Sequence, residues 1–409
     1  MTASSETAGT NIEPFWALDP DVTYLNHGSF GATPRPVLER QQSLRDELER
    51  EPIDFLSRSR ERRIDEARKA LADFVGASAS GLAFVPNATT GVNSVLRSLR
   101  FEAGDELVVT DHAYNACRNA LDFVAERWGA TVSVAPLPFP LASPDEIVDA
   151  VAGALTARTR LAMIDHVTSP TALVLPLPEL VSAIAGRGVE VLVDGAHAPG
   201  MVELDLDELA TLGMTYYAGN CHKWLCAPKG AGFLWVAPGR QPAIRPTVIS
   251  HGANRDTSLR SRFHLEFDWT GTTDFTPWLC VPTAIEAVGG RVEGGWAALR
   301  LRNHELALAA RDLLTATLGI ATPPCPDEMV GSMAALPLAD AGGVVANGPD
   351  TLSQQLRDQF GLEVPVMPWR SPRLRLLRVS AQLYNTRADF ERLADALRAL
   401  SVTGANSVR

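Results

Sequence analysis

The 409-residue chain lacks any apolar run long enough to cross a bilayer, and its first residues, MTASSETAGTN, contain neither a basic segment nor an apolar one. We therefore expect no membrane partner and interpret residues 1–14 as a disordered tail. No basic block stands out against the net charge of −11, which argues against nucleic acid as a partner. Hydrophobic residues at 46% and charged residues at 21% are typical of a soluble globular protein.

Cysteine is also scarce. The residues are odd in number and widely scattered, and none forms a CxxC pair of the kind that binds metals, so no metal site is expected. This usage predicts a reduced, cytoplasmic compartment. The five positions are Cys117, Cys221, Cys226, Cys280 and Cys325.

Short apolar strands alternate with amphipathic helices after residue 76, which predicts an α/β fold with a mostly parallel sheet covered by helices on both faces. From about residue 285 the helices become longer and the strands fewer. Because the chain exceeds the usual size of one core, we predict an N-terminal segment (15–60), a large domain (61–284) and a small α+β C-terminal domain (285–409). The predicted strands are 82–85, 106–109, 131–135, 160–164, 190–193, 215–218 and 232–236, and the longer predicted helices are 36–50, 61–75, 294–318, 349–359 and 386–400.

In two places, a predicted strand is followed by one ionisable side chain. VEVLVDGAHAPG (189–200) ends its apolar run at Asp194, and GNCHKWLCAPKGAGFLWV (219–236) presents Lys223. Because the carboxyl ends of neighbouring parallel strands meet at one crevice, we expect both groups to face one ligand. They suit pyridoxal phosphate (PLP), since a lysine forms a Schiff base with its aldehyde and a carboxylate keeps its pyridine nitrogen protonated. The alternative is a buried Lys–Asp ion pair.

The residues around this pair favour the cofactor. His222 precedes the lysine, and Gly195 and Ala196 are too small to obstruct a flat ring. With YLNHGSFGATP (24–34), NATTG (87–91), TDHAY (110–114), MVGSMAALPL (329–338) and LRVSAQLYNT (377–386), the chain resembles the class V aminotransferase family of fold-type I PLP enzymes, and within it the isopenicillin N epimerase-like branch. The resemblance implies a large domain with a seven-stranded sheet, a small-molecule amino-acid substrate, and a homodimer with shared active sites.

The segment VPNATTGVNSVL (85–96) passes from a strand into a helix that we expect to begin at about Gly91. N–H groups at a helix N-terminus, with threonine hydroxyls beside them, form a phosphate site, and an ordinary N-cap is the alternative. The resemblance implies that Ala88, Thr89 and Thr90 bind the PLP phosphate with help from His222.

WTGTTD (269–274) is similar to the family segment that reaches across a dimer interface to the partner's PLP phosphate. The resemblance therefore implies that Thr272 acts in the neighbouring subunit. A plain glycine-containing turn is the alternative for this segment.

Other segments supply side chains around the ring. In TDHAYNA (110–116), the resemblance places His112 against the pyridine face, and Tyr114 can serve as an acid/base group toward the substrate. His197 can reach the phenolic oxygen of the cofactor. Ser169, in DHVTSPTALVLP (165–176), can hydrogen-bond the cofactor or substrate, although related cysteine desulfurases have an asparagine there.

RLRLLRVSAQLYNT (373–386) predicts a strand with alternating arginines. Arginine holds a carboxylate through two parallel hydrogen bonds, and the resemblance assigns the α-carboxylate of the substrate to Arg378. Arg373 and Arg375 are expected to be exposed strand residues. Near the amino terminus, Asn26 and His27 resemble the segment that folds over the substrate.

Lys223 and Asp194 fit removal of the Cα proton of an amino acid, with the lysine as general base. The outcome stays open between epimerisation, which the resemblance favours, C–S cleavage of a sulfur-containing amino acid, and transamination. A cysteine desulfurase needs a mobile cysteine before the carboxylate-binding arginine, and VPVMPWRSPRLRLL (364–377) contains none. Retention of both Lys223 and Asp194 argues against a PLP-binding protein or scaffold without catalysis.

Overall fold

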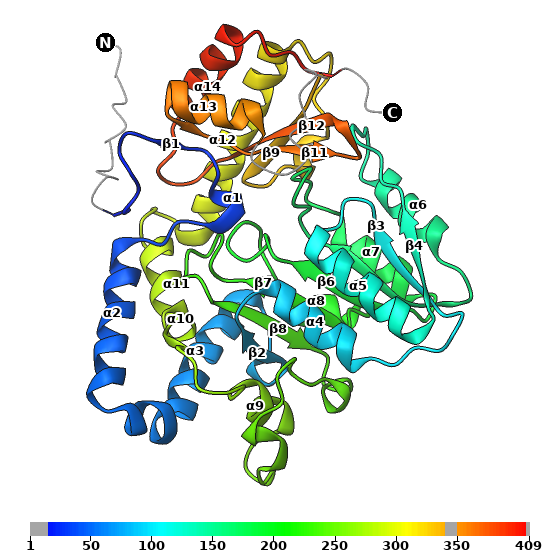
Figure 1. The fold of residues 1–409 in the computed structure, drawn as a ribbon, viewed down its shortest axis with the longest axis vertical. Helices are drawn as coiled ribbons and strands as arrows, with labels where there is room; N and C mark the ends of the chain where they lie inside the picture. Colours follow the sequence, from blue (N-terminus) through cyan, green and yellow to red (C-terminus); the bar gives the residue numbers. More distant parts are fainter. Residues whose placement is uncertain (1–14, 340–349, 406–409) are drawn as a thin grey trace.

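The computed structural model describes residues 15–339 and 350–405, without the side chains of 371–373, and the predicted tail over 1–14 lies outside these residues. A seven-stranded sheet of order β2-β8-β7-β6-β5-β3-β4 forms its centre (Figure 1). Strand β8 is antiparallel to β2 and β7, and the remaining pairings are parallel, so the predicted α/β fold is confirmed. The strands are β2 (Leu82–Val85), β3 (Glu106–Thr110), β4 (Thr131–Ala135), β5 (Thr159–Asp165), β6 (Glu190–Gly195), β7 (Tyr216–Asn220) and β8 (Gly232–Val236).

Alternate residues of each strand enter two cores on opposite faces of this sheet. In β5, Leu161 and Met163 enter one core while Ala162 and Ile164 enter the other, as the period of two along a strand requires. Helices α4 (Ala88–Ser98) and α5 (Asn115–Trp128) cover the first face. The second face is covered by α3 (Arg60–Val75), α6 (Asp145–Ala154), α7 (Leu177–Ala185) and α8 (Leu206–Thr211).

The C-terminal part contains an antiparallel sheet of order β11-β12-β9, which lies above the central sheet in Figure 1. Arg375 on β12 is buried, contrary to the expected exposure, because its guanidinium donates to both carboxylate oxygens of Asp350 at 3.1 Å. The domain boundaries at 60 and 284 stay a prediction. The elements here are α10 (Thr276–Leu279), α11 (Val281–Gly289), α12 (Gly295–Leu318), β9 (Met333–Leu338), α13 (Thr351–Phe360), β10 (Leu362–Glu363), β11 (Val366–Trp369), β12 (Ser371–Ser380) and α14 (Arg387–Ala399).

The N-terminal segment connects the two sheets. Strand β1 (Thr23–Tyr24) pairs with β10, and α1 (His27–Phe30) follows it between the C-terminal part and the central sheet (Figure 1). Gly31 ends α1 with a φ of 73°, and a Cβ at this position would lie 2.2 Å from the carbonyl oxygen of His222. The absence of a side chain therefore lets α1 pack against the loop that carries Lys223. Helix α2 (Arg35–Arg50) and a π-helical turn (Asp54–Arg58) lead on to α3.

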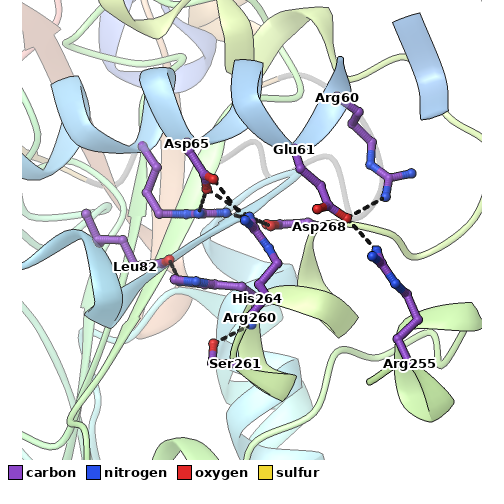
Figure 2. Close-up of polar contacts among 10 residues, drawn as sticks. Arg60, Glu61, Asp65, Leu82, Arg255, Arg260, Ser261, His264 and Asp268 are labelled. Carbon is purple, nitrogen blue, oxygen red and sulfur yellow. Dashed lines mark hydrogen bonds and ion pairs between the residues drawn. The ribbon is translucent and has the colours of Figure 1, made fainter. Parts of the chain in front are cut away.

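Residues 238–275 form no named strand, but they contain the short helix α9 (Arg262–Phe267). Ion pairs hold this segment against α3 (Figure 2). The carboxylate of Asp268 is buried and bonds to Arg68 at 2.5 Å and to Arg260, and Arg260 also bonds to Asp65 at 2.8 Å. The WTGTTD segment begins directly after Asp268, so this network fixes its starting point.

Candidate active site

A cavity of about 340 Å³ opens where β5, β6 and β7 end. This is the edge at which parallel strands present ligand-binding side chains. Eight of the predicted site residues line it: Ala88, Thr89, Tyr114, Ser169, Asp194, His197, His222 and Lys223. Residues that the sequence reasoning missed also line it, among them Ser29, Phe30, Asn87, Asp165, Asn220 and Lys229.

Lys223 follows β7, and its Nζ lies 3.1 Å from Nε2 of His197. The indole N–H of Trp224 points at Nδ1 of His197 at 3.5 Å, which leaves the proton of the neutral imidazole on Nε2, facing the lysine. Burial, with a contribution from the charge of Arg378, lowers the pKa of Lys223 to about 8. Much of the amine is therefore uncharged near pH 8, and the uncharged amine is the form that attacks an aldehyde.

Asp194 is buried at the end of β6. One carboxylate oxygen accepts the backbone N–H of Ala196 at 3.0 Å, and the other accepts the thiol of Cys117 at 3.0 Å. Burial raises the pKa of Asp194. No ion pair joins Asp194 to Lys223 among the residues that the structure describes, so the alternative of a buried Lys–Asp ion pair is wrong, and both groups face the cavity instead.

The N-terminus of α4 forms one wall of the cavity. The helix begins at Ala88, earlier than Gly91, because the side chain of Asn87 caps it by accepting the N–H of Thr90 at 2.8 Å. Asn220, at the end of β7, accepts the N–H of Ala88 at 2.8 Å. Thr90 thus belongs to the cap and does not line the cavity, whereas Ala88 and Thr89 do.

His222 stands beside this helix N-terminus on the cavity wall. Its Nδ1 lies 3.0 Å from the carbonyl oxygen of Ala231, to which it donates. Burial lowers the pKa of His222 to about 4, and a phosphate placed beside it would raise that pKa by its charge. The helix N-terminus and His222 together form an end of the cavity that favours an anion.

Arg378 does not itself line the cavity: it is buried behind two serines that do. Its guanidinium donates to the carbonyl oxygen of Ser169 at 2.6 Å and to the hydroxyl of Ser29 at 3.0 Å. Burial lowers its pKa to about 10, so it stays a cation at neutral pH. Among the described acidic side chains none forms an ion pair with it, and its Nε has no hydrogen-bond partner. A buried cation without a carboxylate beside it fits an anionic ligand.

Two predicted substrate contacts near the amino terminus differ from the structure. His27 is fully buried, with Nδ1 2.8 Å from the hydroxyl of Tyr384 and Nε2 3.0 Å from the carbonyl oxygen of Lys223, so a direct substrate contact is wrong and His27 supports the lysine loop. Asn26 lies behind Ser29, whose hydroxyl it accepts at 2.5 Å. Neither residue lines the cavity.

The expected stacking of His112 on the cofactor ring is also wrong. None of its surface is exposed, its Nδ1 lies 2.9 Å from the hydroxyl of Thr171, and Trp369 packs edge-on against it at 4.7 Å between ring centroids. A ring without a free face cannot stack on a ligand. Tyr114, two residues on, lines the cavity and is 44% exposed.

Thr272 lies outside the active-site cavity of its own chain. It lines a separate cavity of about 380 Å³ with Ile53, Arg255 and Trp269, next to the ion-pair network of Figure 2. Thr272 therefore does not face the active-site cavity of its own chain.

The residues present fit PLP. Lys223 offers an amine for its aldehyde, Asp194 a carboxylate for its pyridine nitrogen, and the N-terminus of α4 an anion site for its phosphate. Asp194 is buried and forms no ion pair with any cationic side chain that the structure describes, and this observation favours a pyridinium partner over a structural role. Fold and cavity together define a PLP-dependent enzyme of fold type I.

Comparisons with known proteins support the same class of enzyme. A family model described as Aminotransferase class-V matches residues 24–393. Isopenicillin N epimerase from Amycolatopsis lactamdurans is 41% identical, and the match covers 97% of this chain and 99% of that protein. A probable chloroplastic L-cysteine desulfhydrase from Arabidopsis thaliana is 32% identical, and the match covers 93% of this chain and 83% of that protein. The structure of the cysteine desulfurase CsdA from Escherichia coli matches with a TM-score of 0.76 at 22% identity, over 95% of this chain and 97% of that chain. This chain belongs to the class V aminotransferase family, and its cofactor is pyridoxal phosphate.

Proposed function

We propose that this enzyme is an amino-acid epimerase, which removes the Cα proton of an amino-acid substrate and returns a proton to the opposite face. The choice of reaction depends on one observation, the 41% identity to isopenicillin N epimerase over nearly the whole of both chains. The sequence motifs resemble those of the isopenicillin N epimerase-like branch, and this resemblance also supports epimerisation.

Three side chains perform the first half of the reaction. When bound, PLP draws electrons from the Cα–H bond of an amino acid joined to it and so makes that proton acidic. The amine of Lys223, uncharged in a large fraction of molecules near pH 8, removes the proton as general base. Asp194 would hold the pyridine nitrogen of the cofactor by accepting a hydrogen bond from it. Arg378 binds the α-carboxylate and thereby fixes which face of Cα meets the lysine.

Epimerisation needs a proton donor on the face of Cα away from Lys223. The sequence suggests three side chains for this role, Tyr114, His27 and His112, and a held water is the alternative. Of these, only Tyr114 lines the cavity, and it combines a hydroxyl with partial exposure to solvent, from which a proton can be replaced. We assign the second proton transfer to Tyr114.

A C–S lyase acting on a sulfur-containing amino acid is the second candidate, because the Arabidopsis relative named a probable L-cysteine desulfhydrase is 32% identical. Transamination is the third outcome of the same proton removal. Incubation with peptide-linked and free L-amino acids in deuterated water separates the three. We expect Cα-deuterated product of both configurations. Pyruvate with a released thiol would establish a lyase, and a requirement for added keto acid would establish a transaminase.

The enzyme is proposed to act as a cytoplasmic homodimer whose two active sites each take Thr272 from the neighbouring chain. Five buried cysteines without a disulfide support a reducing compartment. Exposed apolar side chains support an interface around the Thr272 cavity, since Ile53 lines that cavity at 68% exposure. Val248, Ile249 and Leu259 are further exposed apolar side chains of the loop before WTGTTD.

Mixed dimers test this arrangement. Thr272→Asp places a carboxylate against the partner's phosphate and is expected to lower PLP affinity by about tenfold or more through charge repulsion. In a dimer of one Thr272→Asp chain and one Lys223→Ala chain, both defects fall in one site and the other site is intact, so about half of the wild-type activity should return. A mixed dimer of Lys223→Ala and Asp194→Asn chains keeps one defect in each site and should stay inactive. A fully active monomer in sedimentation would contradict the proposal.

A further inference from the structure

Two carboxyl groups lie next to each other at the inner end of the cavity, and only Asp194 has a role so far. Asp165, the last residue of β5, is the register partner of Asp194 on β6. The residues are 3% and 4% exposed, and both line the cavity. Neighbouring strands are about 4.8 Å apart, and like charges this close disfavour each other's ionisation in a buried site.

The hydrogen bonds favour Asp194 as the charged member of this pair. It accepts two hydrogen bonds, from the N–H of Ala196 and from the thiol of Cys117, and donors of this kind stabilise a carboxylate over a carboxylic acid. Asp165 has two backbone N–H groups beside it, those of Tyr114 and of its own residue, but no side-chain donor such as Cys117 provides to Asp194. Burial and the proximity of Asp194 raise the pKa of Asp165 well above its usual range.

The other titratable groups around the pair do not alter this balance. Burial raises the pKa of the Cys117 thiol, so this side chain on α5 keeps its proton and donates it. Tyr217 on β7 is held uncharged by burial and bonds through its hydroxyl to His166 at 3.0 Å. Lys223, on the loop after β7, is the nearby cationic side chain, and no ion pair joins it to either carboxylate among the described residues.

We propose that Cys117 and Asp165 are positioning residues for the pyridine end of the cofactor: Asp165 stays neutral and Cys117 donates to Asp194, so that the single negative charge of this end lies on Asp194. The inference rests on the proposed role of Asp194 toward PLP. A pyridine nitrogen bound here would meet one carboxylate of fixed orientation, on Asp194, and would keep its proton.

Four variants test the inference through cofactor binding. Apoprotein is titrated with PLP, and the protonation of the pyridine nitrogen is followed by NMR of the holoenzyme loaded with ¹⁵N-labelled PLP. Asp194→Asn should weaken binding on the order of 100-fold and remove the pyridine proton. Asp165→Asn should keep the proton and bind within about threefold of the wild type, since an amide replaces a neutral group of the same shape. Cys117→Ala should weaken binding by about tenfold, and Cys117→Ser, which restores a donor, should recover most of it.

Loss of affinity in Asp165→Asn equal to that in Asp194→Asn would overturn the inference, because the charge would then lie on Asp165. Cys117→Ser as weak as Cys117→Ala would also overturn it, since the cysteine would act by packing alone. Wild-type binding and protonation in Asp194→Asn would instead contradict the role of Asp194 itself.

Melting of the cofactor-free proteins gives an independent readout. A carboxyl whose folded-state pKa is raised contributes stability that is lost as pH rises above the unfolded value of about 4. Wild type should therefore lose more stability than Asp165→Asn between pH 4 and pH 8, and an equal loss in both would overturn the inference.

Discussion

Replacement of Lys223 with alanine is expected to lower the rate of Cα-proton exchange by at least about 10³-fold, because the variant lacks the general base. Some PLP should stay bound, since the N-terminus of α4 and His222 remain in place for the phosphate. Exchange is measured by NMR as loss of the substrate Cα proton in deuterated water, and retained cofactor by absorbance after dialysis.

Lys69→Ala is the matched control for this variant. Lys69 is exposed and pairs with Asp73 one turn along α3, so its replacement should leave exchange unchanged. Cα-proton exchange at the wild-type rate in Lys223→Ala would show that Lys223 is not the general base.

The second large effect is expected at Arg378. Replacement with alanine should lower the catalytic efficiency toward a substrate with a free α-carboxylate on the order of 100-fold, because a buried charge partner is lost. Arg378→Lys should restore only part of this loss, since an ammonium lacks the planar pair of donors. The measurement compares each substrate with its α-carboxamide, on which wild type and variants should differ little. An equal loss on carboxylate and carboxamide would show that Arg378 acts by supporting Ser29 and Ser169 instead.

The sequence predicted the positions of Lys223 and Asp194 because the rule that applies to them is local: an apolar strand ends, and the next polar side chain faces the ligand edge. The same rule applies to Asp165, the residue directly after the predicted strand 160–164, so the sequence already contained a signal for it that was not used. The seven strands were predictable for a related reason, since burial on both faces leaves short continuous apolar runs.

Side-chain direction at turns was not predictable in the same way. His27 and His112 follow turn-like or strand-end sequences, from which a histidine can point into a cavity or into the core. Their direction is decided by residues far along the chain, Tyr384 for His27 and Trp369 for His112. Arg375 was misjudged for the same reason, because its partner Asp350 lies on a different element. Such pairings depend on tertiary packing, which a single sequence pattern does not contain.

The most direct test of the active-site assignment is reduction of the PLP-bound enzyme with borohydride, followed by digestion and peptide mapping. Lysine occurs only at positions 69, 223 and 229, so the mapping distinguishes the cavity lysines Lys223 and Lys229 from the exposed Lys69 without ambiguity. We predict a pyridoxyl label on the peptide that contains Lys223 and on no other. A label on the Lys229 or Lys69 peptide, or an unlabelled Lys223 peptide, would contradict the assignment of Lys223 as the residue that binds the cofactor.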